Sequence, residues 1–380
     1  DLTVEEAAVL VGISNSPSAY DPVAHPKASL EKRNDVLKSM NEIGELSDED
    51  YEKAGAKVTS RDEVLAEADA LGFVDRPSAE TVAKLKAGQW VIGMLGSFTD
   101  ADYVAALEKA GLVGIAIEKL PRKLSSAQSM DEMTSQNSVM GYKAAITAAD
   151  AYGSFLPMMT TAAGTIRPAK ALVLGAGIAG LQAIGTLKRL GAVVTAYDVR
   201  PASQGEVESL GAKFLDLGLD FSKGQGEGGY ARALSAEEQA QQQAAVDEKA
   251  AGFDIIITTA KVPGRKPPVL LTAAGVKGLK RGAVIVDCAA SDLGGNVEGS
   301  AVGEQVTEGG VKLIGAPYLA SGVATTASNL LSRNVADILV HFVRDGKLGQ
   351  DLTEELDDAL VVAGRAAAPA AAADAEKSEK

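Results

Sequence analysis

The sequence predicts an α/β protein that contains a Rossmann-type domain with a doubly wound parallel sheet, together with a second α/β domain. Short apolar runs alternate with helix-like stretches across residues 165–340 and, over a shorter span, across residues 55–130. Strands that alternate with helices form parallel sheets, and helices cover both faces of such sheets. A glycine-rich turn also joins the first apolar run of the longer span to the helical pattern that follows it.

That glycine-rich turn has the spacing of a dinucleotide-binding unit. Gly175, Gly177 and Gly180 follow the apolar run 171–174, and Asp198 follows the next apolar run. The first glycine allows a tight turn, the second lets the backbone approach a pyrophosphate, and the third lets the helix lie close to the strand. The amides at the helix start then face the phosphates. Asp198 is expected to accept hydrogen bonds from the adenine-ribose hydroxyls, which favours NAD over NADP.

The other elements are expected wherever the apolar pattern has strand or helix period. Short apolar runs predict strands at 90–95, 114–117, 193–197, 213–215, 254–258, 283–287 and 312–314. A long helical pattern covers 131–155 and ends before Pro157, because proline restricts the residue that precedes it. A Gln-rich helix is expected over 236–250, with a mainly solvated surface.

These patterns divide the chain into five parts. The expected parts are a helical segment over 1–54, a first α/β domain over 55–130 with 340–362, a linking helix over 131–158, an NAD-binding Rossmann domain over 160–335 and a disordered tail over 363–380. The tail prediction depends on a low-complexity run from Ala366 that is rich in alanine and charge.

Charge and composition exclude several kinds of site. The formal net charge of −14 argues against a nucleic-acid partner, because phosphate backbones attract basic surfaces. Cys288 is the only cysteine, so the chain has no internal disulfide, and we interpret this thiol as a core residue. His25 and His341 are the only histidines and have no metal-ligand spacing, so no metal site is expected. No apolar run approaches the ~20 residues of a membrane helix.

Six stretches of the sequence resemble one family. They are 121–144, 155–201, 206–214, 228–231, 254–271 and 283–300. Together they are similar to the NAD(H)-binding component, or alpha subunit, of proton-translocating nicotinamide nucleotide transhydrogenase. The resemblance implies an oxidoreductase that passes hydride from NADH, bound here, to NADP(H) held on a separate partner component. It also implies a membrane component that couples the reaction to proton movement, a homodimer, and a cytoplasmic location beside the membrane through these partners.

The resemblance also assigns residues to the site. By their position in the family's nicotinamide loop, the catalytic residues are Gln128, Asp131, Arg122 and Thr134. Together with the glycine turn, it assigns cofactor contacts to Gly175, Ala176, Gly177, Ile178, Ala179, Gly180, Asp198, Val199, Arg200, Tyr230, Thr259 and Ala260. Asp131 and Thr134 are alternatively helix caps, and Arg200 is alternatively a surface ion pair. The family often has Pro-Ser-Arg where this chain has Ala320, Ser321 and Gly322, so weaker contacts are expected there.

Two other functions fit parts of the sequence. An alanine dehydrogenase-like enzyme shares the fold, but it needs a general base, which is most often histidine. Residues 85–165 contain no histidine, and the strand ends at 72–77 and 93–98 contain neither the histidine nor the lysine of that enzyme. Hydride transfer between two nicotinamides needs orientation rather than proton exchange, so a rate that depends little on pH between about 6 and 9 is expected. The other alternative is a catalytically silent, NAD-binding chimera.

The chimera alternative comes from the first 54 residues. The stretch 6–22 and the stretch 32–40 resemble the end of the glycosyltransferase domain of bifunctional penicillin-binding proteins, without its Glu-Asp motif. The expected join lies near Ala54. A transhydrogenase alpha subunit opens with a strand–helix unit that these residues replace. The first α/β domain is therefore expected to be incomplete, with an open edge on its sheet.

Overall fold

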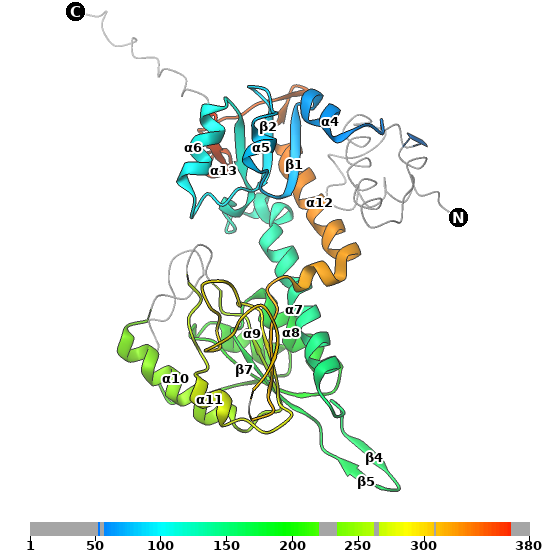
Figure 1. Cartoon of the computed structure of the whole chain (residues 1–380), viewed down its shortest axis with the longest axis vertical. Helices are drawn as coiled ribbons and strands as arrows, with labels where there is room; N and C mark the ends of the chain where they lie inside the picture. Colours follow the sequence, from blue (N-terminus) through cyan, green and yellow to red (C-terminus); the bar gives the residue numbers. More distant parts are fainter. Residues whose placement is uncertain (1–51, 54–56, 220–233, 262–265, 308, 366–380) are drawn as a thin grey trace, which may run out of the picture. The chain divides into compact units, whose positions relative to one another are not determined.

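The computed structural model describes residues 52–53, 57–219, 234–261, 266–307 and 309–365 (Figure 1). The chain forms two compact units, one made of Asp1–Met133 with Ser328–Lys380 and the other of Thr134–Ala327. The chain therefore returns to the first unit at Ser328, earlier than the expected residue 340. In the described part of the chain, no helix is long and apolar enough to cross a membrane.

The second unit contains a seven-stranded sheet of Rossmann type, as predicted. Its strands are β6 (Lys170–Leu174), β7 (Val193–Tyr197), β8 (Lys213–Phe214), β9 (Ile255–Thr258), β10 (Val284–Asp287), β11 (Gly303–Val306) and β12 (Lys312–Gly315). Their order is β11-β12-β10-β9-β6-β7-β8, and all pairs are parallel except β11 with β12. The order reverses between β6 and β9, which is where ligands bind in open α/β sheets. The predicted strands match within one residue; the exposed strand β11 was not predicted.

Alternate residues of the central strand enter two different cores. Ala171 and Val173 pack with Ile184 of α8 (Ile178–Arg189), whereas Leu172 and Leu174 pack on the opposite face. That second face is covered by α10 (Ala236–Ala250) and α11 (Ala273–Lys277), which lie side by side in Figure 1. A strand buried on both faces needs a continuous apolar run, and this is why the run could be recognised in the sequence.

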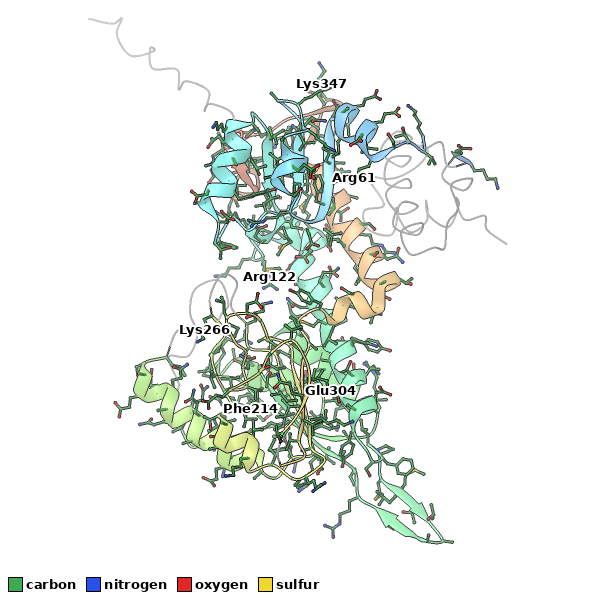
Figure 2. The ribbon with its side chains drawn as sticks, viewed as in Figure 1. Arg61, Arg122, Phe214, Lys266, Glu304 and Lys347 are labelled. Atoms are coloured by element: carbon green, nitrogen blue, oxygen red, sulfur yellow. The ribbon has the colours of Figure 1, made fainter. Side chains whose placement is uncertain are left out.

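The Gln-rich helix α10 has the predicted bounds but is not wholly solvated. Gln242, Val246 and Ala250 are buried at a spacing of four residues, so they form one inner stripe. The amide of Gln242 donates to the hydroxyl of Tyr197 at 2.9 Å. Tyr197 also packs beside Phe214 of β8, which is labelled in Figure 2, with 6.4 Å between ring centroids. The inner stripe therefore fixes α10 against the strand that precedes Asp198.

The predicted linking helix is α7 (Glu132–Ala151), which ends earlier than residue 158. A Cβ on Gly141 would lie 2.0 Å from the carbonyl oxygen of Ala179, so α7 and α8 are in backbone contact there. The ammonium group of Lys312 donates to the carbonyl of Ala151 at 3.1 Å and satisfies the end of α7. An unpredicted hairpin follows, formed by β4 (Met159–Thr161) and β5 (Gly164–Ile166), and all six of its residues are exposed.

The first unit has a four-stranded sheet in the order β1-β2-β3-β15. Its elements are α4 (Arg61–Glu67), β1 (Ala70–Asp75), α5 (Ala79–Val82), β2 (Trp90–Met94), α6 (Ala101–Lys109), β3 (Val113–Ala116), η1 (Ile117–Lys119), η2 (Ser125–Met130), α12 (Ala324–His341), β13 (Val343–Arg344), β14 (Lys347–Leu348), α13 (Glu355–Leu360) and β15 (Val361–Ala363). Strand β1 lies at the edge of the described sheet, and Val74 on it is 66% exposed. Residues 1–51, including the segment similar to penicillin-binding proteins, lie outside the described residues.

The expected tail over 363–380 begins too early. Ala363 is buried in β15, which pairs antiparallel with β3. The carbonyl of Gly364 accepts a hydrogen bond from the Gln350 amide at 2.8 Å. Residues 366–380, where the low-complexity run lies, are outside the described residues.

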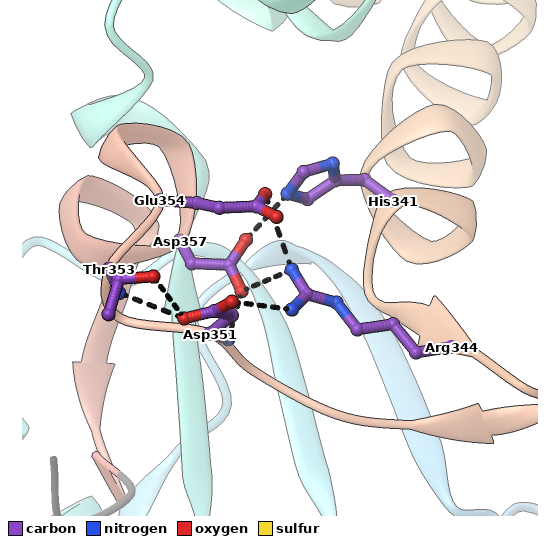
Figure 3. Close-up of polar contacts among 6 residues, drawn as sticks. All are labelled: His341, Arg344, Asp351, Thr353, Glu354 and Asp357. Carbon is purple, nitrogen blue, oxygen red and sulfur yellow. Dashed lines mark hydrogen bonds and ion pairs between the residues drawn. The ribbon is translucent and has the colours of Figure 1, made fainter. Parts of the chain in front are cut away.

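A buried carboxylate holds α13 to the end of α12 (Figure 3). Asp357 is fully buried and accepts hydrogen bonds from His341 Nε2 at 2.5 Å, from Arg344 Nη2 at 3.0 Å and from the Asp351 amide at 2.6 Å. Arg344 also pairs with Glu354 at 3.3 Å. Glu354, Asp357 and His341 are close enough to share a cation. The guanidinium of Arg344 already supplies that positive charge, so we interpret the group as a structural ion-pair network.

Candidate functional site

The turn between β6 and α8 can be built only with glycine at two of its positions. Gly175 has φ +101°, and a Cβ there would lie 2.8 Å from Thr259 Oγ1. A Cβ on Gly180 would lie 1.9 Å from the carbonyl oxygen of Gly175. These contacts agree with the predicted roles of the first and third glycines: a left-handed turn and a close approach of helix to strand.

The space beside Gly177 fits a phosphate group. A Cβ on Gly177 would have no protein atom within 4 Å. Gly177 is the N-cap of α8 and has no side chain to accept from the first amides of the helix. In contrast, α10 and α11 begin with Ser235 and Thr272, whose side chains cap them. The start of α8, with Ile178 and Ala179, therefore presents amide donors and the positive end of the helix dipole.

Asp198 is held at the end of β7 by two neighbours. Its Oδ2 accepts from the Ala176 amide at 2.8 Å and from Arg200 Nη2 at 3.0 Å. Its Oδ1 accepts from the Arg200 amide at 2.8 Å and from Arg200 Nε at 2.9 Å. The Asp198 side chain is 8% exposed. The surface-pair interpretation of Arg200 is therefore wrong, because the pair is partly buried and its hydrogen bonds raise the pKa of the Arg200 guanidinium.

This pairing changes how Asp198 can meet a ribose. A carboxylate has about four acceptor positions, and four donors already use them here. Ribose hydroxyls can reach the Asp198 oxygens only by sharing or replacing the bonds from the Arg200 side chain. Arg200 thus lies at the position that recognises the ribose, and Val199 between the two is partly buried.

The residues after β9 support the glycine turn from the other side. Thr259 Oγ1 donates to the Gly175 carbonyl at 3.0 Å. The Ala260 amide donates to Asn296 Oδ1 at 2.9 Å, and Asn296 Nδ2 donates to the carbonyls of Ala260 and Pro268 at 2.8 Å each. Sequence reasoning missed Asn296, although it lies in a Gly-Gly-Asn run just after a predicted strand.

A second buried acid fixes the end of β10. Asp287 Oδ1 accepts from Thr258 Oγ1 at 2.9 Å and from the Ala289 amide at 2.9 Å, and Oδ2 accepts from the Val297 amide at 3.2 Å. Cys288 beside it is buried, and burial, together with the charge of Asp287, raises the pKa of its thiol to about 12. The structure therefore agrees with the interpretation of Cys288 as an unreactive core residue.

Two of the four predicted catalytic residues form an ion pair in the first unit. Arg122, labelled in Figure 2, donates from Nε to Asp131 Oδ2 at 2.8 Å. Between them, η2 packs Ala127 and Met130 into the core and leaves Gln128 exposed. The Asn334 amide on α12 donates to the Ser129 carbonyl at 2.7 Å and fixes this segment. An anchored segment with an exposed amide is suitable for contact with a ligand.

Thr134 begins the part of α7 that belongs to the second unit. It is partly buried, and its carbonyl accepts from Ser138 Oγ at 2.9 Å. The glycine turn also belongs to the second unit, whereas the Arg122–Asp131 pair belongs to the first.

Tyr230 and the rest of 220–233 lie outside the described residues, so its predicted contact stays a prediction. At the changed Pro-Ser-Arg position, Gly322 lies beside a lysine. A Cβ on Gly322 would be 3.1 Å from Lys143 Cε of α7. The side chain of Lys143 therefore occupies space next to the position where the family often has arginine.

Sequence reasoning also missed two glutamates near the Arg122–Asp131 pair. Glu118 is buried just after β3 and accepts hydrogen bonds from the loop that follows β2. Glu132 is the first residue of α7 and is partly buried. Burial, with the charges of Asp131 and Glu118, raises the pKa of Glu132 to about 7. The available signal was an acid at the carboxyl end of a predicted strand, where ligands bind.

Two family models match the chain. The model of the alanine dehydrogenase/PNT C-terminal domain matches residues 144–367, and the model of the N-terminal domain matches residues 29–140. The N-terminal match includes residues 29–54, which the sequence analysis set apart. The expected join near Ala54 stays a prediction.

Individual relatives agree with these models. The first of the chains that make up NAD(P) transhydrogenase subunit alpha in Rickettsia prowazekii is 42% identical over 324 residues, which are 83% of each chain. The crystal structure of a transhydrogenase from Sinorhizobium meliloti has a TM-score of 0.73 and 39% identity, and covers 87% of this chain and 93% of that one. An alanine dehydrogenase of Mycolicibacterium smegmatis is 29% identical over 67% of this chain and 63% of its own length.

Proposed function

Since this chain belongs to the alanine dehydrogenase/PNT family and, within it, to the NAD(P) transhydrogenase alpha subunits, we propose that it binds NAD(H) and passes hydride to NADP+ held by a partner component. The observation that carries this proposal is the turn from Gly175 to Gly180. It combines an open position at Gly177, an uncapped helix start and Asp198 at the end of the next strand. Each of these features matches a different part of a dinucleotide.

The residues present fit each part of the cofactor. The first amides of α8 suit the pyrophosphate, and the Asp198–Arg200 pair suits the adenine ribose. The backbone around Ala176, Thr259 and Ala260 forms the rest of the turn. A bound nicotinamide supplies the hydride, and the chain's own residues bind and orient it.

Arg122, Gln128, Asp131 and Thr134 orient the nicotinamide end in this proposal. Arg122 and Asp131 are already paired, and Gln128 is exposed beside them. No proton is exchanged in the transfer itself, so these residues act by holding the ring in place. The alanine dehydrogenase alternative is less well supported, because the alanine dehydrogenase is a more distant relative at 29% identity.

The strand ends in question also hold no substrate-ready side chains. Arg76 pairs with Asp100 at 2.7 Å, and Ser97 Oγ donates to Glu118 at 2.8 Å. An amino-acid dehydrogenase needs groups at these ends that are available to a carboxylate substrate and to a proton in transfer. Both ends are instead used for contacts within the chain.

The proposal includes partners, because the relatives are subunits of a larger enzyme. One partner component holds NADP(H), and a membrane component couples the reaction to proton movement. The chain itself forms a homodimer and lies at the cytoplasmic side of the membrane through these partners. The β4–β5 hairpin supports the homodimer: Figure 1 shows it extending from its unit, and it carries exposed Met159 and Ile166, with exposed Met158 just before it.

The function is tested by titration followed by turnover. NADH fluorescence should saturate on addition of the chain, and NADPH should bind much more weakly. With the NADP-binding component added, the chain should then transfer hydride from NADH to NADP+, and it should not oxidise alanine with NAD+. Alanine oxidation without hydride transfer would overturn the proposal in favour of the dehydrogenase, and NADH binding without either reaction would favour the silent chimera.

A further inference from the structure

Three carboxyl groups gather where the candidate nicotinamide loop meets the first sheet. Glu118 lies in η1 after β3, Asp131 ends the η2 segment, and Glu132 begins α7. All three belong to the first unit. Like charges this close in a partly buried place cannot all be stabilised equally well, and one of the carboxyl groups then keeps its proton.

Two of the three carboxylates have donors that stabilise their negative charge. Glu118 Oε1 accepts from the Ser97 amide and from Ser97 Oγ, both at 2.8 Å, and Oε2 accepts from the Leu95 amide at 3.2 Å. Asp131 accepts from the Arg122 guanidinium at 2.8 Å. Hydrogen bonds and a nearby cation both favour the ionised form of a carboxyl group.

Glu132 is the group in the less favourable position. Its Oε2 is buried from solvent. Burial is the largest cause of its raised pKa, and the charges of Asp131 and Glu118 add to it. The charged groups around it are Glu118 on η1, Arg122 before η2 and Asp131 beside it. The helix that reaches this segment through the Asn334–Ser129 bond, α12, also carries Arg333 and Asp337.

We propose that Glu132 is a positioning residue whose proton preserves the Arg122–Asp131 pair and thereby the nicotinamide loop. This inference rests on the proposed function. Neutral Glu132 leaves the Arg122 guanidinium to Asp131. Ionised Glu132 repels Asp131 and competes with it for Arg122, which displaces the exposed Gln128 between them. Hydride transfer therefore slows as Glu132 loses its proton, although Glu132 touches no reacting atom.

The first test observes the loop directly and needs no turnover. The carboxyl carbon of Glu132 is followed by ¹³C NMR in the labelled full chain and assigned by its loss in Glu132→Gln. It should titrate as one proton near pH 7. The Arg122 Nε–H and Gln128 side-chain amide signals should follow the same curve, and they should not titrate in Glu132→Gln. Signals that stay constant, or that still titrate in the variant, would overturn the inference.

The second test is the pH profile of hydride transfer with the NADP-binding component, measured by stopped flow. Small displacements of a reacting group cost up to about 100-fold in rate, and we expect a fall of about tenfold from pH 6 to pH 8. Glu132→Gln should keep the faster rate at every pH and bind NADH as before. The matched control is Glu108→Gln on the exposed face of α6, which should keep the wild-type profile.

The outcomes separate the two proposals. A flat wild-type profile, or a profile unchanged by Glu132→Gln, overturns the role of Glu132 and leaves the proposed function standing. Absence of hydride transfer at every pH overturns the proposed function, and the NMR titration still decides whether the proton of Glu132 controls the loop.

Discussion

Single residues in the glycine turn differ in what they are needed for. Gly175 and Gly180 are required by the fold, because a Cβ at either position would overlap the backbone or side chain of a neighbour. Gly177 has open space instead and is required only if a ligand approaches it. The same motif therefore contains structural and binding glycines, and substitutions can tell them apart.

The first prediction concerns these glycines. Gly177→Val should abolish NADH binding with little change in the free energy of unfolding, because its side chain enters only the phosphate space. Gly180→Ala should lower the free energy of unfolding by about 1–3 kcal/mol through overpacking. Fluorescence titration and urea unfolding measure the two effects. Normal NADH binding by Gly177→Val would place the phosphate site elsewhere.

The second prediction concerns the choice of cofactor at Asp198. A 2′-phosphate about 4 Å from this carboxylate costs roughly 4 kcal/mol at an effective dielectric near 20. NADH should bind far more tightly than NADPH, and Asp198→Ala should narrow the difference, because it removes the repulsion and releases the Arg200 guanidinium. Arg200→Ala is the matched control, since it frees Asp198 and should not improve NADPH binding. Equal affinity of the wild-type chain for both nucleotides would refute the assignment.

At the scale of elements, the η2 segment and the start of α7 act together. The Arg122–Asp131 pair and the Asn334–Ser129 bond anchor the segment at two points, and Gln128 is exposed between them. The third prediction is that Gln128→Asn, which shortens the side chain by one methylene, slows hydride transfer strongly and changes NADH affinity only modestly. Gln136→Asn on the same helix system is not a suitable control, because the Gln136 amide donates to the Ala327 carbonyl.

A suitable control for Gln128 is Lys123→Ala, an exposed position in the loop that precedes η2. It should leave both the rate and the affinity near their wild-type values. If Gln128→Asn lost NADH affinity as strongly as it lost rate, the amide would serve binding in general rather than orientation of the ring.

The fourth prediction concerns the stability of this element against pH. The folded chain keeps a proton on Glu132 up to about pH 7, whereas the ordinary value is 4.5. The folded state thus binds more protons between these values, and stability falls as pH rises through this range. At about 1.36 kcal/mol per pKa unit, the loss is roughly 3 kcal/mol by pH 8. Glu132→Gln should remove this fall in urea unfolding at pH 5 and pH 8, and Glu108→Gln should retain it.

The raised pKa of Glu132 also changes an expectation from the sequence. The absence of histidine from residues 85–165 predicts hydride transfer that is nearly independent of pH. A buried carboxyl group with a raised pKa can titrate in the same range as histidine, and Glu132 is such a group. The pH-independent profile is now expected of Glu132→Gln and not of the wild-type chain.

For the whole molecule, the fifth prediction concerns assembly. Met158 is 65% exposed, and Met159 and Ile166 are exposed on the hairpin that follows it. Exposed apolar groups on an extended hairpin are a common dimer contact, because burying them releases water. Ile166→Asp should convert the dimer to a monomer in sedimentation velocity. Val302→Asp, another exposed apolar position of the second unit, should leave the dimer intact. A wild-type monomer would exclude the proposed homodimer.

The sequence by itself determined the class of fold, the strands of the second unit and the glycine turn. These features depend on local patterns: an apolar run long enough for a strand buried on both faces, and glycines at the spacing of a turn. The helix α10 was also predicted to the residue, because Ser235 and the polar run after it are local signals. The family could be recognised for the same reason, since its motifs are short and contiguous.

Only the tertiary structure decided how the site residues are paired. Asp198 bonds to Ala176, which is 22 residues away along the chain, and Asn296 bonds to Ala260, which is 36 residues away. Strand β15 completes the first sheet from a segment that reads as the start of a tail. The proton on Glu132 depends on burial and on Glu118 from another element. Burial and charge are set by neighbours that the fold brings together, and no local pattern in the sequence records them.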